Sequence, residues 1–303
     1  MIDLYENCRL CPRLCGVNRK NSAGRCGEAD IPRISWVGAH HGEEPPISGS
    51  KGSCTVFFSG CSLACIYCQN YQISSGEIGD KTDIESLFGL ISNTLDTEGA
   101  HNVNFVSPDH FFPHVFMLAK LFRDRRPSLP LIYNTSGYQR VSMLKMAEPF
   151  SDIYLPDYKY SDSFLAGKYS NAPDYPTTAL EALSEMILQK GFLNSFETQA
   201  DIATKGVLVR HLILPGAVQN SIDALTTLFL EFGKNLPLSL MSQYHPVSGL
   251  EPPIDRIITS EEFYEVYCHA MELGFKNIFA QFPEDNSHEF YNPDFREKTP
   301  FSI

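Results

Sequence analysis

From Ser53 onward, short strand-like runs of apolar residues alternate with longer helical ones. Runs rich in β-branched and aromatic residues predict strands, and these runs are Cys54–Ser59, Val103–Ser107, Leu131–Thr135, Ile153–Tyr158, Val207–Leu214, Leu238–Tyr244 and Asn277–Phe282. Between them, apolar residues recur at intervals of three and four, which predicts helices over Ile84–Leu95, Phe111–Arg123, Val141–Glu148, Thr178–Lys190, Ser221–Phe232 and Glu261–Leu273. This alternation is typical of a parallel sheet covered by helices. Because no Gly-x-Gly-x-x-Gly follows the first strand, the pattern favours an α/β barrel or part-barrel over a doubly wound open sheet.

Residues 1–52 differ from the rest of the chain. They are rich in Gly, Pro, Ser, Cys and Arg and show little sustained periodicity. We therefore expect a small, loop-dominated module that bound metal holds together in place of a core. The remaining residues, 53–303, are expected to form the barrel and a C-terminal extension.

Charge and hydropathy exclude several classes of partner. The net charge is −12, and in residues 53–303 taken together 17 Lys and Arg face 30 Asp and Glu, so the surface is expected to repel nucleic acid. The basic run Arg123–Arg126 ends a predicted helix, where cations complement the helix dipole. No apolar run approaches the roughly 20 residues that cross a membrane, and the first residues lack the blocks of a signal peptide. We expect a cytoplasmic protein with no nucleic-acid or membrane partner.

Nine cysteines in a chain without a secretion signal indicate metal binding rather than a disulfide framework. Seven of them form two groups, one near the N-terminus and one directly after the first predicted strand. Cys54 and Cys268 stand apart, and we interpret both as small buried residues.

The second group, Cys61, Cys65 and Cys68, is the most informative feature of the chain. Three thiolates at this spacing can hold three irons of a [4Fe–4S] cube and leave the fourth iron open. Electron carriers usually close the cube with a fourth cysteine, and zinc sites usually combine paired Cys-x-x-Cys units or Cys with His. The triplet follows the first strand, so in a barrel it would lie at the mouth of the active site.

The first group consists of Cys8, Cys11, Cys15 and Cys26. Four thiolates can close either a zinc site or a second iron–sulfur cluster. The sequence leaves this choice open and favours a structural role.

Polar residues at the ends of the other strands are expected to gather at the same mouth. Asp157 and Lys159 lie on one face of a strand, where they could hold a ligand or form a surface ion pair. Arg210 lies within an apolar strand and needs a partner, so we expect it to face a polar lumen or a ligand. His245 ends a strand, where it could either contact a ligand or serve as a hydrogen-bonded structural residue. Further strand-end candidates are Asn104, Ser107, Asp109, Asn134, Thr135, Ser136, Gly137, His211, Gln243 and Tyr244.

The chain resembles the radical S-adenosylmethionine (radical SAM) enzymes at Cys61-x-x-x-Cys65-x-x-Cys68. Over about residues 8–250 it is similar to the branch labelled pyruvate formate-lyase activating enzymes. The motifs that carry this resemblance are Leu10-Cys11-Pro12-Arg13-Leu14-Cys15, His41-Gly42-Glu43-Glu44-Pro45, Ser48-Gly49, Val56-Phe57-Phe58-Ser59-Gly60-Cys61, Cys68-Gln69-Asn70, Leu155-Pro156-Asp157-Tyr158-Lys159, Val209-Arg210-His211-Leu212 and Ser242-Gln243-Tyr244.

The resemblance implies a partial (β/α)6 TIM-like barrel in which Cys61, Cys65 and Cys68 bind a [4Fe–4S] cluster. S-adenosylmethionine would bind the fourth iron, and its reductive cleavage would give methionine and a 5′-deoxyadenosyl radical that abstracts hydrogen from a protein or a small molecule. A low-potential donor of the flavodoxin or ferredoxin type would supply the electron. The residues implied to hold S-adenosylmethionine are Asn134, Thr135, Ser136, Gly137, Asp157, Lys159 and His245.

One segment departs from the activating enzymes. Their second strand usually leads into a Gly-Gly-Glu-Pro-like segment that binds the amine of S-adenosylmethionine, and here Val106-Ser107-Pro108-Asp109 stands in its place. Asp109 or a backbone carbonyl could serve instead. The alternative to the enzyme is a non-catalytic iron–sulfur electron carrier or a structural metal protein on the same scaffold.

Overall fold

A central array of parallel strands organises the protein. The computed structural model describes residues 1–74, 78–198, 201–285 and 293–301. Its strands are β1 Arg33–His40, β2 Ser53–Phe58, β3 Asp80–Lys81, β4 Val103–Val106, β5 Leu131–Thr135, β6 Ile153–Pro156, β7 Gly206–Val207, β8 Val209–Leu212, β9 Leu238–Met241 and β10 Ile278–Ala280. The helices are α1 Pro45–Ser48, α2 Tyr71–Ser74, α3 Ile84–Glu98, α4 Phe112–Arg125, α5 Val141–Ala147, α6 Ser163–Ser170, α7 Tyr175–Lys190, α8 Ser195–Thr198, α9 Val218–Phe232 and α10 Ser260–Leu273. Single 3₁₀ turns cover Ile2–Tyr5, Asp109–Phe111, Glu148–Phe150 and Pro283–Asp285.

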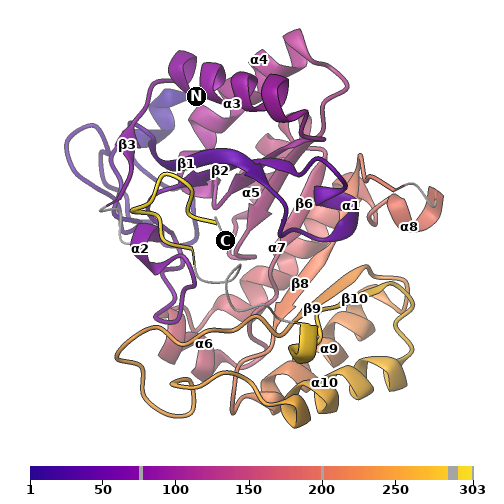
Figure 1. The fold of residues 1–303 in the computed structure, drawn as a ribbon. Coiled ribbons are helices and arrows are strands. Elements are labelled where there is room, and N and C mark those ends of the chain that lie inside the picture. The colour runs from indigo at the N-terminus through magenta and orange to yellow at the C-terminus, as the bar shows by residue number, and fades with distance from the viewer. Residues whose placement is uncertain (75–77, 199–200, 286–292, 302–303) are drawn as a thin grey trace.

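Two sheets join into one curved wall (Figure 1). The first has the order β3-β1-β2-β4-β5-β6-β7 and the second the order β10-β9-β8. A parallel bridge between Asp157 and Arg210 connects them, with the amide of Tyr158 donating to the carbonyl of Arg210 at 2.8 Å. Apart from β3, which pairs with β1, the strands from β2 to β10 therefore run parallel in chain order. A helix of at least seven residues follows each of β4, β5, β6, β8 and β9. This confirms the predicted α/β part-barrel.

Strand β1 was missed by the sequence analysis. It pairs antiparallel with β2, from Ile34 opposite Phe58 to His40 opposite Ser53. Most of its residues are half-buried, because β3 pairs only with Arg33 and Ile34 on its outer side and the strand contains few strongly apolar residues. Within residues 1–52, then, residues 33–40 belong to the main sheet. The division after residue 52 stays a prediction.

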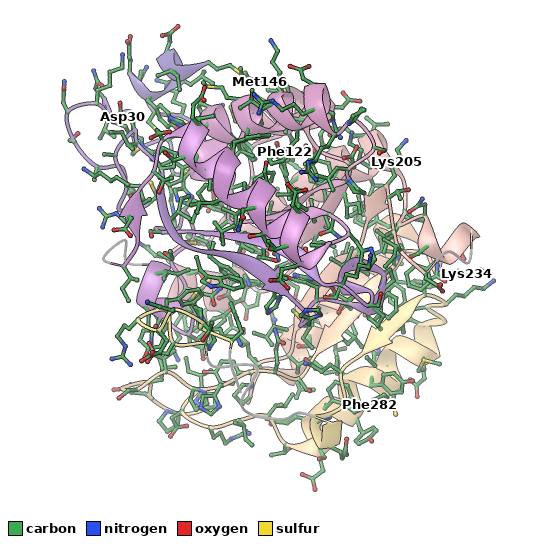
Figure 2. The ribbon with its side chains drawn as sticks, turned by 45° about the horizontal axis from the view of Figure 1, so that its top comes forward. Asp30, Phe122, Met146, Lys205, Lys234 and Phe282 are labelled. Atoms are coloured by element: carbon green, nitrogen blue, oxygen red, sulfur yellow. The ribbon has the colours of Figure 1, made fainter. Side chains whose placement is uncertain are left out.

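Local sequence signals fix the helix ends. In α3, the side chain of Asp83 accepts from the amide of Ser86 at the N-terminus, and Gly99 ends the helix with φ 70°. In α10, Thr259 and Glu262 form a capping box. The apolar faces turn inward: Phe122 of α4, labelled in Figure 2, is fully buried and its ring lies 4.7 Å from that of Phe88 in α3.

The C-terminal segment, residues 293–301, packs on the antiparallel edge of the sheet. Figure 1 shows the yellow chain beside β1, β3 and α2, and ring contacts confirm the packing: Phe295 lies 5.2 Å from Phe57, and Phe301 lies 5.2 Å from Trp36. The amide of Phe295 donates to Gln72 at 2.7 Å. This segment therefore covers one side of the barrel mouth.

The two isolated cysteines have different surroundings. Cys54 is fully buried in β2, as predicted. Cys268 is exposed, which corrects its interpretation as a buried residue, because α10 turns Phe263, Val266 and Ala270 inward and leaves position 268 on its outer face. No helix within the described ranges is both long and apolar enough to span a membrane.

Candidate active site

The cysteine triplet lies in the tight loop that follows β2. Cys61, Cys65 and Cys68 all line the same cavity. The loop is wound by short-range hydrogen bonds: the amide of Cys68 donates to the carbonyl of Cys65 at 3.1 Å, and the amide of Ala64 lies 3.4 Å from the sulfur of Cys61. Ala64 adopts a left-handed φ of 52°, which a loop this tight requires. The three sulfurs are thus presented together on one wall.

A chain of hydroxyl groups supports the middle cysteine. The hydroxyl of Ser170, at the end of α6, donates to the sulfur of Cys65 at 3.0 Å. Tyr160 lies 2.7 Å from Ser170 and 2.8 Å from the hydroxyl of Tyr67. All three hydroxyl-bearing residues are buried. A hydrogen bond to sulfur favours the thiolate form, which is the form that binds metal.

Burial raises the pKa of two thiols of the triplet, Cys61 and Cys68. Burial raises the pKa of Cys68 to about 11, and Cys65 adds to this while the ammonium of Lys159 opposes it. Burial also raises the pKa of Cys61, with further contributions from Cys68 and Cys65. Binding of a metal centre would therefore displace protons from this wall.

The donor set fits an iron–sulfur cube. Within the described parts of the chain, no three His, Cys, Asp or Glu side chains converge so as to hold a single metal ion. A cube places a separate iron in front of each thiolate, so its ligands have no common point. Of the described cysteines, only Cys61, Cys65 and Cys68 line the cavity. They would hold three irons and leave the fourth facing the cavity.

The cavity has a volume of about 600 Å³, a size that accepts a small molecule or cofactor. It is built at the carboxyl ends of the parallel strands, as barrel architecture predicts. Besides the cysteines, the predicted residues that line it are Ser107, Asn134, Thr135, Ser136, Asp157, Lys159, Arg210, Gln243, Tyr244 and His245. Phe57, Phe279 and Phe301 supply aromatic surface.

Asp157 and Lys159 form an ion pair inside the cavity rather than on the surface. The ammonium nitrogen of Lys159 lies 2.6 Å from a carboxylate oxygen of Asp157, and both side chains are mostly buried. Burial alone would lower the pKa of Lys159, but Asp157 and Cys65 more than offset it, so the pKa is raised. The site therefore keeps a fixed positive charge close to the cysteine wall.

Tyr175, at the start of α7, positions two of the strand ends. Its hydroxyl lies 2.8 Å from the carbonyl of Ser136 and 2.9 Å from that of Asp157, and it accepts from the amide of Lys159 at 3.0 Å. Gly137 does not line the cavity. At φ 77° its backbone passes so close to β6 that a Cβ would lie 2.0 Å from the carbonyl oxygen of Asp157. Its role in the described structure is to permit this close approach.

Arg210 pairs with two glutamates that the sequence analysis did not assign to it. Its guanidinium lies 2.5 Å from a carboxylate oxygen of Glu43 and 2.5 Å from one of Glu44, and all three side chains are less than one-tenth exposed. Asn104 donates to Glu43 at 3.0 Å, and His40 lies 3.4 Å from it. The prediction that Arg210 faces a polar lumen is confirmed, and the network places buried charge on the wall between β1 and β8.

The network makes a pH-dependent contribution to stability. Burial would raise the pKa of Glu43, but Arg210 outweighs it and lowers the pKa from 4.5 to about 2. This contribution to stability is present above the pKa that Glu43 has in the unfolded chain. It is lost as pH falls from 4.5 towards 2. Near neutral pH we expect Glu43→Gln to lower the free energy of unfolding by at most on the order of 3 kcal/mol. Denaturant titrations across this pH range should show the difference shrinking; a constant difference would contradict the assignment.

Several other candidates lie away from the cavity. Asp109 is buried behind the triplet loop, where it accepts from the hydroxyl of Ser62 at 2.5 Å, and burial raises its pKa to about 6. It therefore does not offer the cavity an amine contact. His211 is also buried, with its ring nitrogens 2.6 Å from the carbonyl of Tyr158 and 2.8 Å from the hydroxyl of Ser221. The cysteines of the first group, Cys8, Cys11, Cys15 and Cys26, do not line the cavity either.

Comparison with known proteins adds a family match for the region of the triplet. A family model described as a 4Fe-4S single cluster domain matches residues 47–184. This range contains Cys54 and the three cavity cysteines; Cys54 is sealed inside β2.

Similar proteins include an uncharacterized protein of Methanocaldococcus jannaschii, MJ0674, which is 28% identical over 288 residues, 90% of this chain and 76% of that protein. Among solved structures, native anSMEcpe with bound AdoMet matches with a TM-score of 0.49 at 12% identity, over 74% of this chain and 61% of that one. Methylornithine synthase matches with a TM-score of 0.44 at 17% identity, over 78% and 73% of the two chains. The matched part of the chain spans about three-fifths of the length of anSMEcpe.

Proposed function

We propose that the protein is a radical SAM enzyme. The observation that carries the proposal is the Cys-x-x-x-Cys-x-x-Cys loop, whose three thiols line one wall of a cavity of about 600 Å³ at the carboxyl ends of parallel strands. The match of residues 47–184 to a single-cluster 4Fe–4S domain supports it. When bound, the cluster would supply one electron and an open iron for S-adenosylmethionine, which is cleaved to methionine and a 5′-deoxyadenosyl radical that takes a hydrogen atom from the substrate.

The chain's own task would be to bind and orient S-adenosylmethionine and to exclude water. The ammonium group of Lys159 is suited to bind the carboxylate of S-adenosylmethionine. The carboxylate of Asp157 is suited to bind its amine or a ribose hydroxyl. Asn134, Thr135 and Ser136 offer amide and hydroxyl groups on the neighbouring strand end. His245 lines the same cavity.

The finer proposal is activation of a glycyl-radical enzyme, as in the branch of activating enzymes that the motifs resemble. This requires a flexible glycine loop of a protein partner to enter the cavity, beside the aromatic wall of Phe57, Phe279 and Phe301. A small-molecule substrate would use the same opening. A flavodoxin or ferredoxin type of donor would supply the electron that each cleavage consumes.

Anaerobic reconstitution with iron and sulfide tests the proposal. With dithionite and S-adenosylmethionine, we expect methionine and 5′-deoxyadenosine in equal amounts, measured by chromatography and mass spectrometry. A fully loaded protein that yields neither product, and whose cluster spectrum does not change when S-adenosylmethionine is added, would indicate a non-catalytic electron carrier instead.

A further inference from the structure

The four N-terminal cysteines are brought together behind the triplet loop. Cys8, Cys11 and Cys26 are buried, while Cys15 is half-buried. The sulfur of Cys15 lies 3.8 Å from the carbonyl oxygen of Cys8. A Cβ placed on Gly24 would lie 3.3 Å from the sulfur of Cys26 and 3.6 Å from that of Cys15. Cys11 is near enough to Cys8 and Cys26 to interact electrostatically with both. Residues up to 18 positions apart in the sequence thus share one small region.

A buried positive charge lies in the same region without a carboxylate partner. Arg19 is fully buried, and its Cδ is 3.7 Å from the same Gly24 position. Its guanidinium donates to backbone carbonyls, including those of Glu28 and Ala29 at 3.1 Å, and its central carbon lies 4.7 Å from the centre of the Tyr5 ring. Among the described residues it forms no ion pair with Asp or Glu.

A buried charge is costly without an opposite charge nearby. The carboxyl groups of Glu28 and Asp109 interact electrostatically with Arg19 but form no ion pair with it. Four thiolates around Zn²⁺, or around a [4Fe–4S] cube, carry a net charge of about −2. Such a centre would place negative charge beside Arg19 that no ion pair supplies. A cube needs its four ligands to stand apart, whereas zinc needs them to turn towards one point. Among the described residues no three Cys, His, Asp or Glu side chains converge on one point, so the arrangement suits a cube.

We propose that Cys8, Cys11, Cys15 and Cys26 hold a second metal centre with four thiolate ligands, and that Arg19 is its buried counter-ion. The centre supports the triplet loop from behind. The carbonyl of Cys26 accepts from the amide of Cys61 at 3.1 Å, and Gly60, at φ 79°, permits this approach.

Arg13 strengthens the link between the two cysteine groups. It lies between Cys11 and Cys15, and its guanidinium donates to the carbonyls of Ser62 at 2.9 Å and Leu63 at 3.0 Å in the triplet loop. It also donates at 2.7 Å to the carbonyl of Ser170, the residue whose hydroxyl contacts Cys65. A metal centre that fixes Cys11 and Cys15 would therefore fix the position of the triplet as well.

Metal analysis in a chain without the triplet separates this proposal from the proposed function. The variant C61A/C65A/C68A, purified anaerobically, has no site for the first cluster. We expect it to keep about four irons with sulfide per chain. About one zinc per chain in their place would show four thiolates that converge on a single ion, and would overturn the assignment of a cluster. A folded variant that binds neither metal under metal-replete conditions overturns the proposal.

Variants that leave every ligand in place test the counter-ion. In the same background, Arg19→Met should lose metal to a chelator about tenfold faster, and Arg19→Lys should recover part of the retention because it keeps the charge. Arg125→Met is the matched control, because it removes an arginine of α4 that stacks on Phe88 of α3. Equal retention in Arg19→Met and the parent variant would refute the role of Arg19.

A glycine pair tests the location of the centre. Gly24→Ala places a methyl group between two of the sulfurs and should lower metal occupancy. Gly89→Ala in α3, where a Cβ meets nothing within 4 Å, should not. Unchanged occupancy in Gly24→Ala would place the metal elsewhere.

Discussion

Replacing Cys65 by alanine is expected to abolish formation of methionine and 5′-deoxyadenosine. One iron of the cluster would lose its thiolate, and the hydroxyl of Ser170, now 3.0 Å from the sulfur, would lose its acceptor. The loss should appear both as lower iron and sulfide content and as the absence of products after reconstitution. Chromatography of the products, together with iron analysis of the same sample, measures both.

Two other cysteines provide matched controls for this prediction. Cys268→Ala removes an exposed thiol on α10, and Cys54→Ala removes a fully buried one inside β2. Both lie outside the cavity, so both variants should retain cleavage. If Cys65→Ala keeps full cleavage activity, or if Cys268→Ala loses it, the assignment of the triplet is wrong.

The parallel strands and long helices could be predicted because their sequences carry one dominant period. Consecutive residues such as Ile153, Tyr154 and Leu155 of β6 are buried on both faces of the sheet and form a continuous apolar run. Strand β1 has no such signal, since it is half-buried and Gly38 and Ala39 follow its larger apolar residues. Helix α6 was missed for a related reason: it spans eight residues and buries only Ala166, Tyr169 and Ser170.

Most of the cavity could also be predicted, because residues at the carboxyl ends of parallel strands meet at one edge. That rule located Asn134, Asp157 and Lys159. It could not separate Gly137, which serves the close approach of two backbones, from its neighbours that line the cavity. Tyr175 escaped because it reaches the strand ends from the start of a helix.

The partners of Arg210 show a different limit. An arginine inside an apolar strand signals that a counter-charge exists, but it does not say where in the chain. Glu43 and Glu44 come from a segment more than 160 residues earlier, and only the packing of β1 against the barrel brings them to β8. The adjacent glutamates before Pro45-Pro46 were a usable signal. A helix there, α1, begins at Pro45 and fixes the position of Glu44 at its N-terminus.

Removal of the Arg210 charge is expected to destabilise the protein strongly. Arg210→Met would leave Glu43 and Glu44 buried without a cation, and loss of one partner of a buried ion pair costs about 3–5 kcal/mol. Denaturant unfolding at neutral pH, monitored by circular dichroism on the metal-loaded protein, measures the change. Arg296→Met breaks an ion pair with Asp294 that is largely exposed and should leave stability unchanged within error.

A charge-free version of the network separates stability from function. In E43Q/E44Q/R210M no ionised group remains in the network, so much of the stability lost in Arg210→Met should return. The three side chains line the cavity but supply no thiolate to the cluster, so this variant should still cleave S-adenosylmethionine while losing any substrate contact that depends on these charges. If Arg210→Met unfolds at the same denaturant concentration as the wild type, the two glutamates do not depend on Arg210 for their charge balance.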